Sequence, residues 1–300
     1  MEAYINLLTH RGEDQDRAWL ARLPTILATC ERQWGLQIGP RFPTQSPHYV
    51  APAVRADGRA VVVKAHAPTG EFAQEAEALQ LFAGRGTVQL LSCDPSNEVL
   101  LLERLLPGSP LSRITDDEQA TSVAVTIMRQ MWRPVQEDHP FPSIFDWGAG
   151  FVHLRQSYEG GSGPFPPTLL AEAETLYAEL SASQAESVLL HGDLHHDNIL
   201  AAQRQPWLAI DPKGLLGEPA YEVGALLRNA LPEHLSSYQL ARLLARRLDQ
   251  LAEELYVDRA RVRGWGLAQA VLAEWWCLED SGKLCDPTLT CAHLLAAIKV

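Results

Sequence analysis

The sequence predicts an α+β fold in which a small β-rich lobe precedes a larger helical lobe. In the first third of the chain, short apolar runs separated by turn residues indicate strands, with one helix inserted among them. After Pro107-Gly108 the spacing of the apolar residues becomes that of long helices. No regular alternation of strands and helices runs along the chain, which argues against a doubly wound sheet or a TIM barrel. We therefore expect an N-terminal lobe over residues 1–105 and a C-terminal lobe over residues 106–300, hinged near residues 103–108.

The N-terminal lobe is expected to hold a leading helix, several short strands and one internal helix. Trp19 and Leu23 give the leading helix an apolar face, and Pro24 is expected to interrupt it. Asp57-Gly58 has the composition of a tight hairpin turn, and Thr69 can cap the internal helix. The expected helices cover residues 16–34 and 69–82, and the expected strands cover residues 36–42, 49–54, 60–64, 88–91 and 99–102.

The C-terminal lobe is expected to be mainly helical. Its few extended pieces are a short buried strand over residues 187–190 and a small ribbon formed by residues 198–201 and 207–210. Everything after Pro219 has a helical pattern. The expected helices of this lobe cover residues 116–138, 167–180, 237–255 and 262–279.

Composition narrows the classes of function. Hydrophobic residues make up 46% of the chain and charged residues 21%, as in ordinary soluble globular proteins. The net charge of −12 opposes binding to nucleic acid and to anionic membranes, and it favours a cationic partner. We find no signal peptide and no apolar stretch near the roughly 20 residues of a membrane span. The five cysteines are odd in number and lack a Cys-x-x-Cys pair, so we expect no disulfide framework and a cytoplasmic location. The oligomeric state is not set by the sequence.

The richest polar segment is His191-Gly192-Asp193, with Asn198 following at a fixed spacing. It comes directly after the strand over residues 187–190, and Asp211 stands at the end of a later strand. Transfer of a phosphoryl group to a hydroxyl needs a carboxylate for the hydroxyl proton and oxygen ligands for Mg²⁺. The pattern His-x-Asp-x-x-x-x-Asn supplies the first carboxylate and one ligand. We predict Asp193 as the catalytic base and Asn198 and Asp211 as the metal ligands.

The same segment has two other interpretations. Imidazole and carboxylate groups together suit zinc or iron, which would make the chain a metallohydrolase. The spacing is not the helical His-Glu-x-x-His, and no second cluster of such residues follows downstream. A structural turn rich in capping residues is the other interpretation, and the full spacing with Asp211 argues against it. The residues of the metal interpretation are His191, Asp193, His195, His196 and Asp197.

Phosphoryl transfer also requires groups that hold the nucleotide. Lys64 ends the apolar run Ala60–Lys64, as expected for a lysine that binds the α- and β-phosphates. Glu75 on the following helix is its expected partner, with Glu77 in reserve. The loop over the phosphates should be Pro43–His48, where Ser46 offers a hydroxyl in place of glycines. The adenine is expected against the backbone of Glu103 and Leu105, provided that the strand over residues 99–102 is an edge strand.

These motifs, in this order, resemble the aminoglycoside phosphotransferase superfamily, which has a bilobal protein-kinase-like fold. The segment from Trp207 to Asn229, which includes Asp-Pro-Lys-Gly, is similar more narrowly to the aminoglycoside/hydroxyurea antibiotic resistance kinases, the streptomycin 6-phosphotransferase branch. Gly84–Leu91 and Leu100–Arg104 fit the same branch, and the resemblance covers residues 40–280 or so.

The resemblance implies an enzyme that uses ATP and Mg²⁺ to phosphorylate a hydroxyl group of a small cationic molecule, with an aminoglycoside such as streptomycin as the expected acceptor. Residues 1–105 would then be the nucleotide-binding lobe, and residues 106–300 the catalytic and substrate-binding lobe. Because Asp211-Pro212-Lys213-Gly214 stands in place of Asp-Phe-Gly, the in/out switching of protein kinases is not expected.

Binding a cationic acceptor calls for carboxylates, and aromatic faces suit the rings of aminocyclitols and sugars. Packing of the tryptophans in the core is the alternative, since buried aromatic residues dominate core energetics. Glu222 is a further candidate carboxylate, and Asp146 and Trp147 are weaker candidates. The predicted substrate residues are Glu218, Glu274, Trp275, Glu279 and Asp280.

Two other functions remain open. A kinase for a metabolic amino alcohol, amino acid or sugar would use the same catalytic residues, because the pattern does not depend on which hydroxyl attacks. A nucleotide-binding pseudokinase that acts as a scaffold is the second. The presence of the lysine, the base and both metal ligands argues against it.

Overall fold

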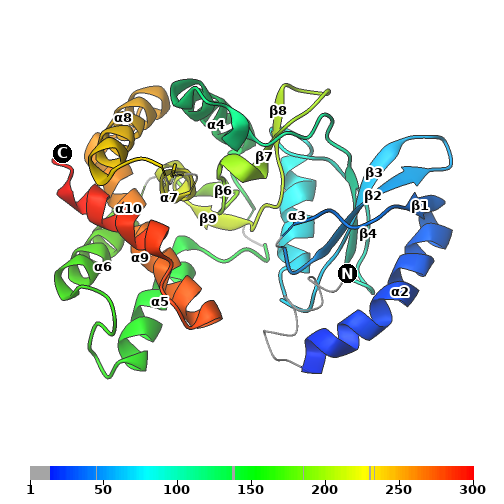
Figure 1. The fold of residues 1–300 in the computed structure, drawn as a ribbon, viewed down its shortest axis with the longest axis horizontal. Coiled ribbons are helices and arrows are strands. Elements are labelled where there is room, and N and C mark those ends of the chain that lie inside the picture. The colour runs from blue at the N-terminus through cyan, green and yellow to red at the C-terminus, as the bar shows by residue number, and fades with distance from the viewer. Residues whose placement is uncertain (1–13, 45, 137–138, 185, 230, 233) are drawn as a thin grey trace. The chain divides into compact units, whose positions relative to one another are not determined.

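The computed structural model describes residues 14–300 except residues 45, 137–138, 185, 230 and 233. The chain divides into two compact units, Met1–Gly108 and Ser109–Val300. Figure 1 shows a sheet with the helices α2 and α3 in the described part of the first unit, and mainly helices in the second. The α+β fold with a β-rich N-terminal part and a helical C-terminal part is thus confirmed.

The first unit is built on a five-stranded antiparallel sheet with the order β1-β2-β3-β5-β4. The β2–β3 hairpin closes at the predicted Asp57-Gly58 turn, where Asp57 Oδ1 accepts a hydrogen bond from the Arg59 amide (3.0 Å). The condition that the strand over residues 99–102 be an edge strand is not met, because β5 lies between β3 and β4. The strands are β1 Leu36–Ile38, β2 Tyr49–Arg55, β3 Ala60–Ala65, β4 Leu90–Asp94 and β5 Val99–Glu103.

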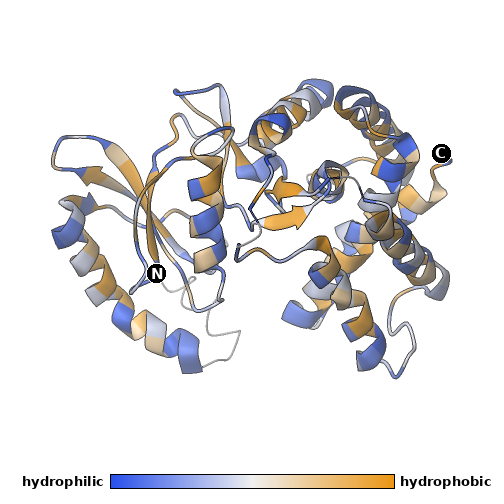
Figure 2. Ribbon diagram, turned by 180° about the vertical axis from the view of Figure 1, so that it is seen from behind, coloured by the Kyte–Doolittle hydropathy of each residue, from blue (hydrophilic) through white to orange (hydrophobic). Residues whose placement is uncertain are grey.

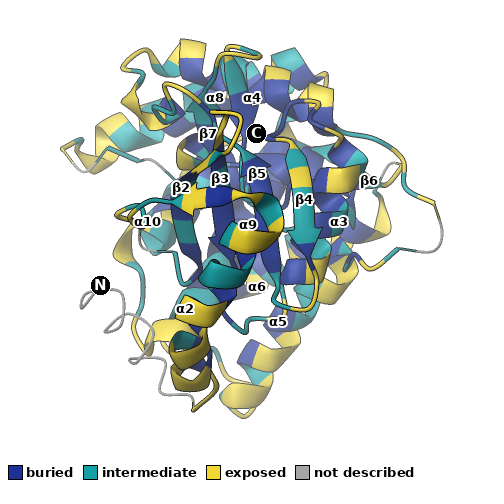
Figure 3. Cartoon of the chain, turned by 90° about the vertical axis from the view of Figure 1, so that its right-hand side faces the viewer, coloured by how far each residue is buried: buried dark blue, intermediate teal, exposed yellow. Residues whose placement is uncertain are grey.

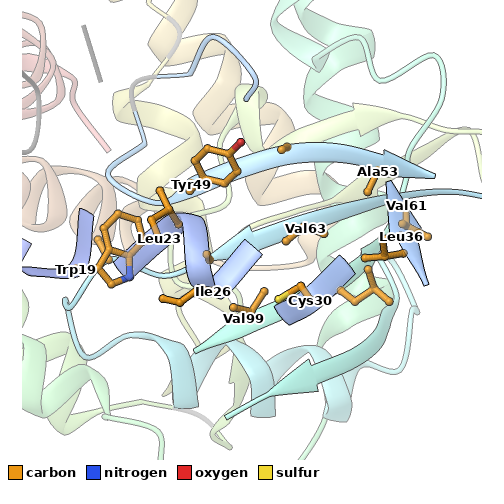
Figure 4. Packing of buried hydrophobic residues seen from close by; sticks show 14 residues of the cluster. Trp19, Leu23, Ile26, Cys30, Leu36, Tyr49, Ala53, Val61, Val63 and Val99 are labelled. Atoms are coloured by element: carbon orange, nitrogen blue, oxygen red, sulfur yellow. The ribbon is translucent and has the colours of Figure 1, made fainter. Parts of the chain in front are cut away.

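The helix α2 (Asp14–Trp34) covers one face of this sheet. Trp19, Leu23, Ile26 and Cys30 lie on one side of α2 and pack against the strands (Figure 4). Figure 2 shows the same helix with hydrophilic residues elsewhere on its surface, and Figure 3 shows strands β3 and β5 mostly buried. The predicted interruption at Pro24 does not occur. Pro24 lies on the exposed side, where its ring does not disturb the packing.

The helix α3 (Phe72–Phe82) lies on the face of the sheet opposite to α2, where its Glu75 contacts Lys64 of β3. Successive strand residues point to opposite sides of a sheet. Val61 and Val63 pack in the cluster with α2, so Lys64 points away from α2. The helix begins at Phe72 rather than at Thr69, whose hydroxyl instead donates to the Glu71 carboxylate (3.2 Å).

The second unit is organised around α9 (Arg259–Ser281), whose middle is fully buried and which packs against α5, α6, α7, α8 and α10. The helix predicted over residues 116–138 ends at Met131, ahead of Pro134, and residues 137–138 lie outside the described residues. The other helices are α4 Asp117–Met131, α5 Ile144–Ser157, α6 Pro167–Ala182, α7 Val223–Arg228, α8 Ser237–Leu255 and α10 Asp286–Ala297, and the 3₁₀ turns are η1 Leu111–Arg113, η2 His196–Asn198 and η3 Pro219–Glu222.

The helix α5 was not predicted, because Gly148 and Gly150 weaken the helical pattern. A capping box formed by Ser143 and Asp146 starts this helix. The glycines serve packing: a Cβ on Gly148 would lie 2.6 Å from the Tyr177 ring, and one on Gly150 would lie 2.6 Å from a Leu272 methyl group.

Two small ribbons complete the second unit, and they carry the functional loops described below. Strand β6 pairs with β9, and β7 pairs with β8, both antiparallel. The β7–β8 ribbon was predicted, whereas β9 was not. The strands are β6 Val188–Leu190, β7 Ile199–Ala201, β8 Trp207–Ala209 and β9 Leu215–Gly217.

One disulfide joins Cys277 near the end of α9 to Cys285 at the start of α10. The expectation that the cysteines would form no disulfide framework has to be corrected for this pair, because the turn after α9 brings the two residues together. Among the helices that the structure describes, none is both long enough and apolar enough to cross a membrane.

Candidate active site

The His191-Gly192-Asp193 loop follows strand β6 and is fixed by the His191 ring. The Asp193 amide donates to His191 Nδ1 (3.2 Å), and His191 Nε2 lies 2.8 Å from the carbonyl of Ile210. This arrangement requires a neutral ring with its proton on Nε2. Burial lowers the pKa of His191 to about 4, so the ring stays neutral at physiological pH. His191 therefore holds the loop in place.

Gly192 is required at the centre of this loop. Its φ of 85° lies in the left-handed region that favours glycine. A Cβ at this position would also lie 3.2 Å from Lys213 Cβ and 3.3 Å from Trp147 Cη2. The backbone is thus close to both the loop after Asp211 and the start of α5.

Glu222 fixes the backbone of the His191-Gly192-Asp193 loop. Its carboxylate is buried and accepts hydrogen bonds from the amides of His191 (2.7 Å) and Gly192 (3.0 Å). Burial raises the pKa of Glu222 to about 7, against the opposing effect of these hydrogen bonds. The Glu222 side chain therefore supports the loop backbone. The sequence had suggested Glu222 as an acceptor-binding residue, but its carboxylate is buried and bonded to the loop amides.

Asp193, the predicted base, is held by contacts of both its side chain and its backbone. Arg228 at the end of α7 donates to Asp193 Oδ1 (2.9 Å), and His195 Nε2 lies 3.7 Å from Oδ2. The Asn198 amide group donates to the Asp193 carbonyl (3.0 Å). The Asp193 side chain remains partly exposed at 29%. The carboxylate is therefore oriented and still accessible to a hydroxyl group.

The ribbon β7–β8 brings the predicted metal ligands together. The Ile210 amide donates to the Asn198 carbonyl (2.9 Å), which places Asn198 beside the strand end that carries Asp211. The Lys213 amide donates to the His191 carbonyl (2.8 Å), so the loop after Asp211 is also joined to the His191-Gly192-Asp193 loop.

The chemistry of these donors fits magnesium. The Asn198 amide nitrogen is engaged with Asp193, so its oxygen is the atom that can face a metal. The Asp211 carboxylate is the second oxygen donor, and its backbone takes a left-handed conformation with φ of 63°, which aspartate tolerates better than most residues. Hard oxygen donors with open positions for phosphate and water are the arrangement that Mg²⁺ prefers.

The residues of the zinc or iron interpretation do not converge. Both ring nitrogens of His191 contact backbone groups, and His195 Nδ1 accepts from the Asp197 amide (3.2 Å). Asp197 accepts from the Ser112 hydroxyl, and His196 is buried. Within the described part of the chain, no three His, Cys, Asp or Glu side chains are arranged to hold a metal ion.

In the first unit, Lys64 and Glu75 form the predicted ion pair. Lys64 Nζ lies 2.5 Å from Glu75 Oε2, and both side chains are buried. The pair follows from the fold, since Lys64 points away from α2 and Glu75 lies on the buried side of α3.

The loop over residues 43–48 is held by Arg41. Its guanidinium donates to the carbonyls of Phe42 (3.2 Å), Thr44 (3.0 Å) and Ser46 (2.9 Å). Ser46 Oγ accepts from the His48 amide (3.2 Å), and Gln45 lies outside the described residues. The conformation of this loop, which lacks glycines, is thus fixed by the side chain of Arg41, two residues before it.

The predicted adenine contacts are placed at the end of β5. The Glu103 amide donates to the Gln89 carbonyl (2.9 Å), so it is not available to a nucleotide base. Leu105 lies beyond the strand, and its side chain is buried. The edge-strand condition fails because β4 pairs along β5.

The predicted acceptor residues separate into buried and exposed groups. Glu218 is paired with Arg261 (2.7 Å) and hydrogen bonded to Trp265, and Glu274 accepts from the Cys285 amide (2.5 Å). Trp275 is buried as well. Glu279 and Asp280 are exposed at the end of α9.

The aromatic surface near the loop is formed by Trp147 and Trp276 instead. Both side chains are partly exposed, and their rings meet edge to face at 5.3 Å. Trp147 is also the residue that approaches Gly192. Trp276 is on the same helix as Glu279 and Asp280, three and four positions before them, so the three side chains share one face.

Arg228 and the anchoring role of Glu222 were missed at the sequence level. Both residues follow Asp211 in the sequence. They reach the His191-Gly192-Asp193 loop only because η3 and α7 pack next to that loop in the folded unit. The carboxylate of Glu222 next to glycine and hydrophobic residues was a signal of burial, but the partner of a buried carboxylate cannot be identified from local spacing.

The fold and this arrangement of side chains define a protein-kinase-like phosphotransferase that acts on an alcohol group. A sequence model described as "Aminoglycoside/hydroxyurea antibiotic resistance kinase" matches residues 34–281. The chain belongs to this family of aminoglycoside-type phosphotransferases, as its motifs had suggested.

Individual relatives agree with this assignment. The chain is 31% identical over 270 residues to streptomycin 6-kinase of Streptomyces griseus. The matched region covers 90% of this chain and 87% of that protein. It is 33% identical over 274 residues to hydroxyurea phosphotransferase of Kitasatospora aureofaciens. The matched region covers 90% of this chain and 77% of that protein.

Solved structures share the fold at low sequence identity. The choline kinase LicA from Streptococcus pneumoniae superposes with a TM-score of 0.63 at 13% identity, over 93% of this chain and 100% of that chain. A thermostable mutant of aminoglycoside phosphotransferase APH(4)-Ia, in ternary complex with ADP and hygromycin B, gives a TM-score of 0.61 at 13% identity, over 91% of this chain and 98% of that chain. These likenesses show the protein-kinase-like fold.

Proposed function

We propose that this enzyme uses ATP and Mg²⁺ to phosphorylate a hydroxyl group of a small cationic molecule, with an aminoglycoside of the streptomycin type as the acceptor. The observation that carries the proposal is the oriented but accessible carboxylate of Asp193. The Asn198 side-chain amide donates to the Asp193 carbonyl, and the Asn198 carbonyl accepts from the amide of Ile210, the residue before Asp211. The names of the streptomycin kinases among its relatives support the acceptor class.

In this proposal the C-terminal lobe, residues 106–300, carries the chemistry. Asp193 accepts or orients the proton of the attacking hydroxyl, and Arg228 keeps its carboxylate in place. Asn198 and Asp211 would hold magnesium, which when bound offsets the negative charge of the phosphates. The neutral His191 ring fixes the loop that carries Asp193 relative to the segment that carries Asp211.

The N-terminal lobe, residues 1–105, is proposed to bind ATP. Lys64, fixed by Glu75, binds the phosphates as a point charge. Ser46 lies in the loop proposed to cover the phosphates. The hinge from Glu103 to Leu105 is proposed to contact the adenine, with the Glu103 amide excluded because it is already bonded to Gln89.

The acceptor is proposed to lie against Trp147 and Trp276, with Glu279 and Asp280 binding its cationic groups. Aromatic faces suit the C–H surfaces of sugar and cyclitol rings, and exposed carboxylates bind guanidinium and ammonium groups in charge-assisted hydrogen bonds. Trp275, Glu218 and Glu274 are left out of this acceptor site, because their side chains are buried and the two carboxylates have partners inside the protein.

The test is an acceptor panel with purified enzyme, Mg²⁺ and ATP labelled at the γ-phosphate. The panel contains streptomycin, a second aminoglycoside, hydroxyurea, choline, an amino acid with a hydroxyl group and a simple sugar. Transfer to streptomycin well above background, abolished in Asp193→Asn, is expected. Transfer to choline or the sugar alone would establish a metabolic kinase instead, and nucleotide binding without any transfer would establish a pseudokinase.

We further propose a cytoplasmic location, where ATP is available. Such a compartment is reducing, so Cys277 and Cys285 would be thiols in the cell and would oxidise after purification. Counting thiols in freshly lysed and in air-exposed protein tests this: a disulfide already present in freshly lysed cells, trapped by alkylation, would contradict the proposed location.

A further inference from the structure

A chain of buried ionisable side chains extends beyond the Lys64–Glu75 pair in the first unit. His66 follows β3 two positions after Lys64, and His48 precedes β2. Tyr49 and Ala65 face each other in the β2–β3 ladder and belong to the cluster under α2. The neighbouring residues His48 and His66 therefore point to the face that carries α3.

His66 contacts the same carboxylate oxygen as Lys64. Its side chain has no solvent exposure, and Nε2 lies 3.1 Å from Glu75 Oε2, the atom that Lys64 Nζ approaches to 2.5 Å. The contact is polar but is not an aligned hydrogen bond. The His66 amide donates to the Glu98 carbonyl (2.9 Å), and its ring packs edge to face on Phe72 at 5.4 Å. The backbone and α3 thus fix the ring beside the carboxylate.

His48 continues the chain to the loop proposed to cover the phosphates. Its ring lies 4.4 Å from that of His66. The Ala67 amide donates to His48 Nδ1 (3.2 Å), so the proton of the neutral ring is on Nε2, which lies 3.4 Å from Glu71 Oε2. Since His48 is the last residue of the loop over residues 43–48, the loop is connected to the ion pair through two imidazole rings in contact, tilted by 40° to each other.

We propose that His66 is a positioning residue for nucleotide binding: it keeps the Glu75 carboxylate turned toward Lys64, and through His48 it couples the loop over residues 43–48 to that pair. The physical reason is that a buried ion pair is favourable only when its remaining polar atoms have partners and its geometry is fixed. The His66 ring supplies a polar edge at Oε2, the same oxygen that Lys64 approaches. The charged and titratable groups around His66 are Lys64, Glu75, His48 and Glu71. The inference rests on the proposed role of Lys64 in ATP binding.

The first test compares His66→Leu, which removes the polar edge at similar volume, with His66→Gln, which restores a nitrogen donor. We expect His66→Leu to raise the Kd for Mg·ATP, measured by calorimetry, and the KM for ATP about fivefold, the effect of one neutral polar contact. The KM for the acceptor should change less than about twofold. His66→Gln should recover most of the loss. A purely structural role predicts no such split and no recovery by glutamine.

Leu79→Ala is the matched control, because Leu79 is buried on α3 and its side chain has no polar atom. It should lower the Tm while the Kd for Mg·ATP stays near that of the wild type. Unchanged ATP affinity in folded His66→Leu, or an equal effect of Leu79→Ala, would overturn the proposal.

A second readout does not depend on the proposed function. In urea unfolding, the effects of His66→Leu and Glu75→Gln should be non-additive in the double variant, because each removes the same contact. Additive effects would refute the His66–Glu75 coupling. If the wild type bound no nucleotide, the proposed function would fail, while this cycle would still decide whether His66 positions Glu75.

Discussion

The buried carboxylate of Glu222 predicts opposite effects of pH on stability and on activity. Its pKa is about 7 in the folded protein and 4.5 in its ordinary environment. Between these values the folded state holds a proton that the unfolded state has released. The contribution of Glu222 to the free energy of unfolding is therefore fully present below pH 4.5. This contribution is lost as the pH rises through 7. A difference of 2.5 between the two values corresponds to roughly 3 kcal/mol of unfolding free energy.

Activity should change in the other direction. An ionised Glu222 accepts the hydrogen bonds from the amides of both His191 and Gly192, whereas the protonated acid has one good acceptor oxygen. The loop that carries Asp193 is therefore best held when Glu222 is charged. We expect kcat to rise with pH with a midpoint near 7, the pH range over which the protein becomes less stable.

The substitution Glu222→Gln isolates this effect. Glutamine offers a single acceptor oxygen, and its NH₂ group would oppose one of the two amide donors. Leaving one buried amide without a partner costs about 1–3 kcal/mol, so we expect a loss of kcat of roughly tenfold or more. Because glutamine does not titrate, the change in unfolding free energy between pH 5 and pH 8 should shrink by roughly 3 kcal/mol.

The assay is urea unfolding at pH values from 5 to 8, with kcat measured at the same points. Glu253→Gln is the matched control, because Glu253 is exposed on α8 and should change neither curve. If wild type and Glu222→Gln kept parallel stability curves over this range, the assignment of the titration to Glu222 would be wrong.

Three further predictions concern the same unit. Arg228→Met should lower kcat about 10- to 100-fold with little change in the Kd for ATP, because a charge-assisted hydrogen bond to Asp193 is lost; an unchanged kcat would show that the carboxylate needs no such support. Gly192→Ala should lower the unfolding free energy by about 2 kcal/mol in urea titration, because alanine is strained at a φ of 85° and crowds Lys213 Cβ; equal stability would contradict the close packing of the loop. Cys285→Ser should remove the effect of a reductant, which is expected to lower the stability of the oxidised wild type by about 2–3 kcal/mol; a wild type insensitive to reductant would contradict this.

The parts of the site that were predicted from the sequence are those whose geometry is local. Asp193 and Asn198 are separated by a short loop, and Asp211 follows at the end of the paired strand, so their spacing already restricts where they can lie. The Lys64–Glu75 pair depends only on the alternation of a strand and on the helix that follows it. In each case the chain is too short between the residues to allow many arrangements.

The parts that were missed depend on packing between distant segments. Trp275 and Trp276 are neighbours, and their directions differ by about 100° on a helix, so which one faces the core depends on the rotation of α9. That rotation is set by α6, α7 and α10. Likewise, α5 was not predicted because its glycines are chosen for close contact with Tyr177 and Leu272 and not for helix propensity.

The two imidazole contacts of His191 have a consequence for how the enzyme can change its acceptor. The ring links the amide of Asp193 to the carbonyl of Ile210, so the distance between Asp193 and the segment that carries Asp211 is set by contacts within residues 191–210. The surface proposed to receive the acceptor comes from α5 and α9, which contribute no atom to that linkage. Substitutions on those helices can therefore alter which molecule binds without altering the chemistry, and a single scaffold can serve a family whose members act on dissimilar compounds.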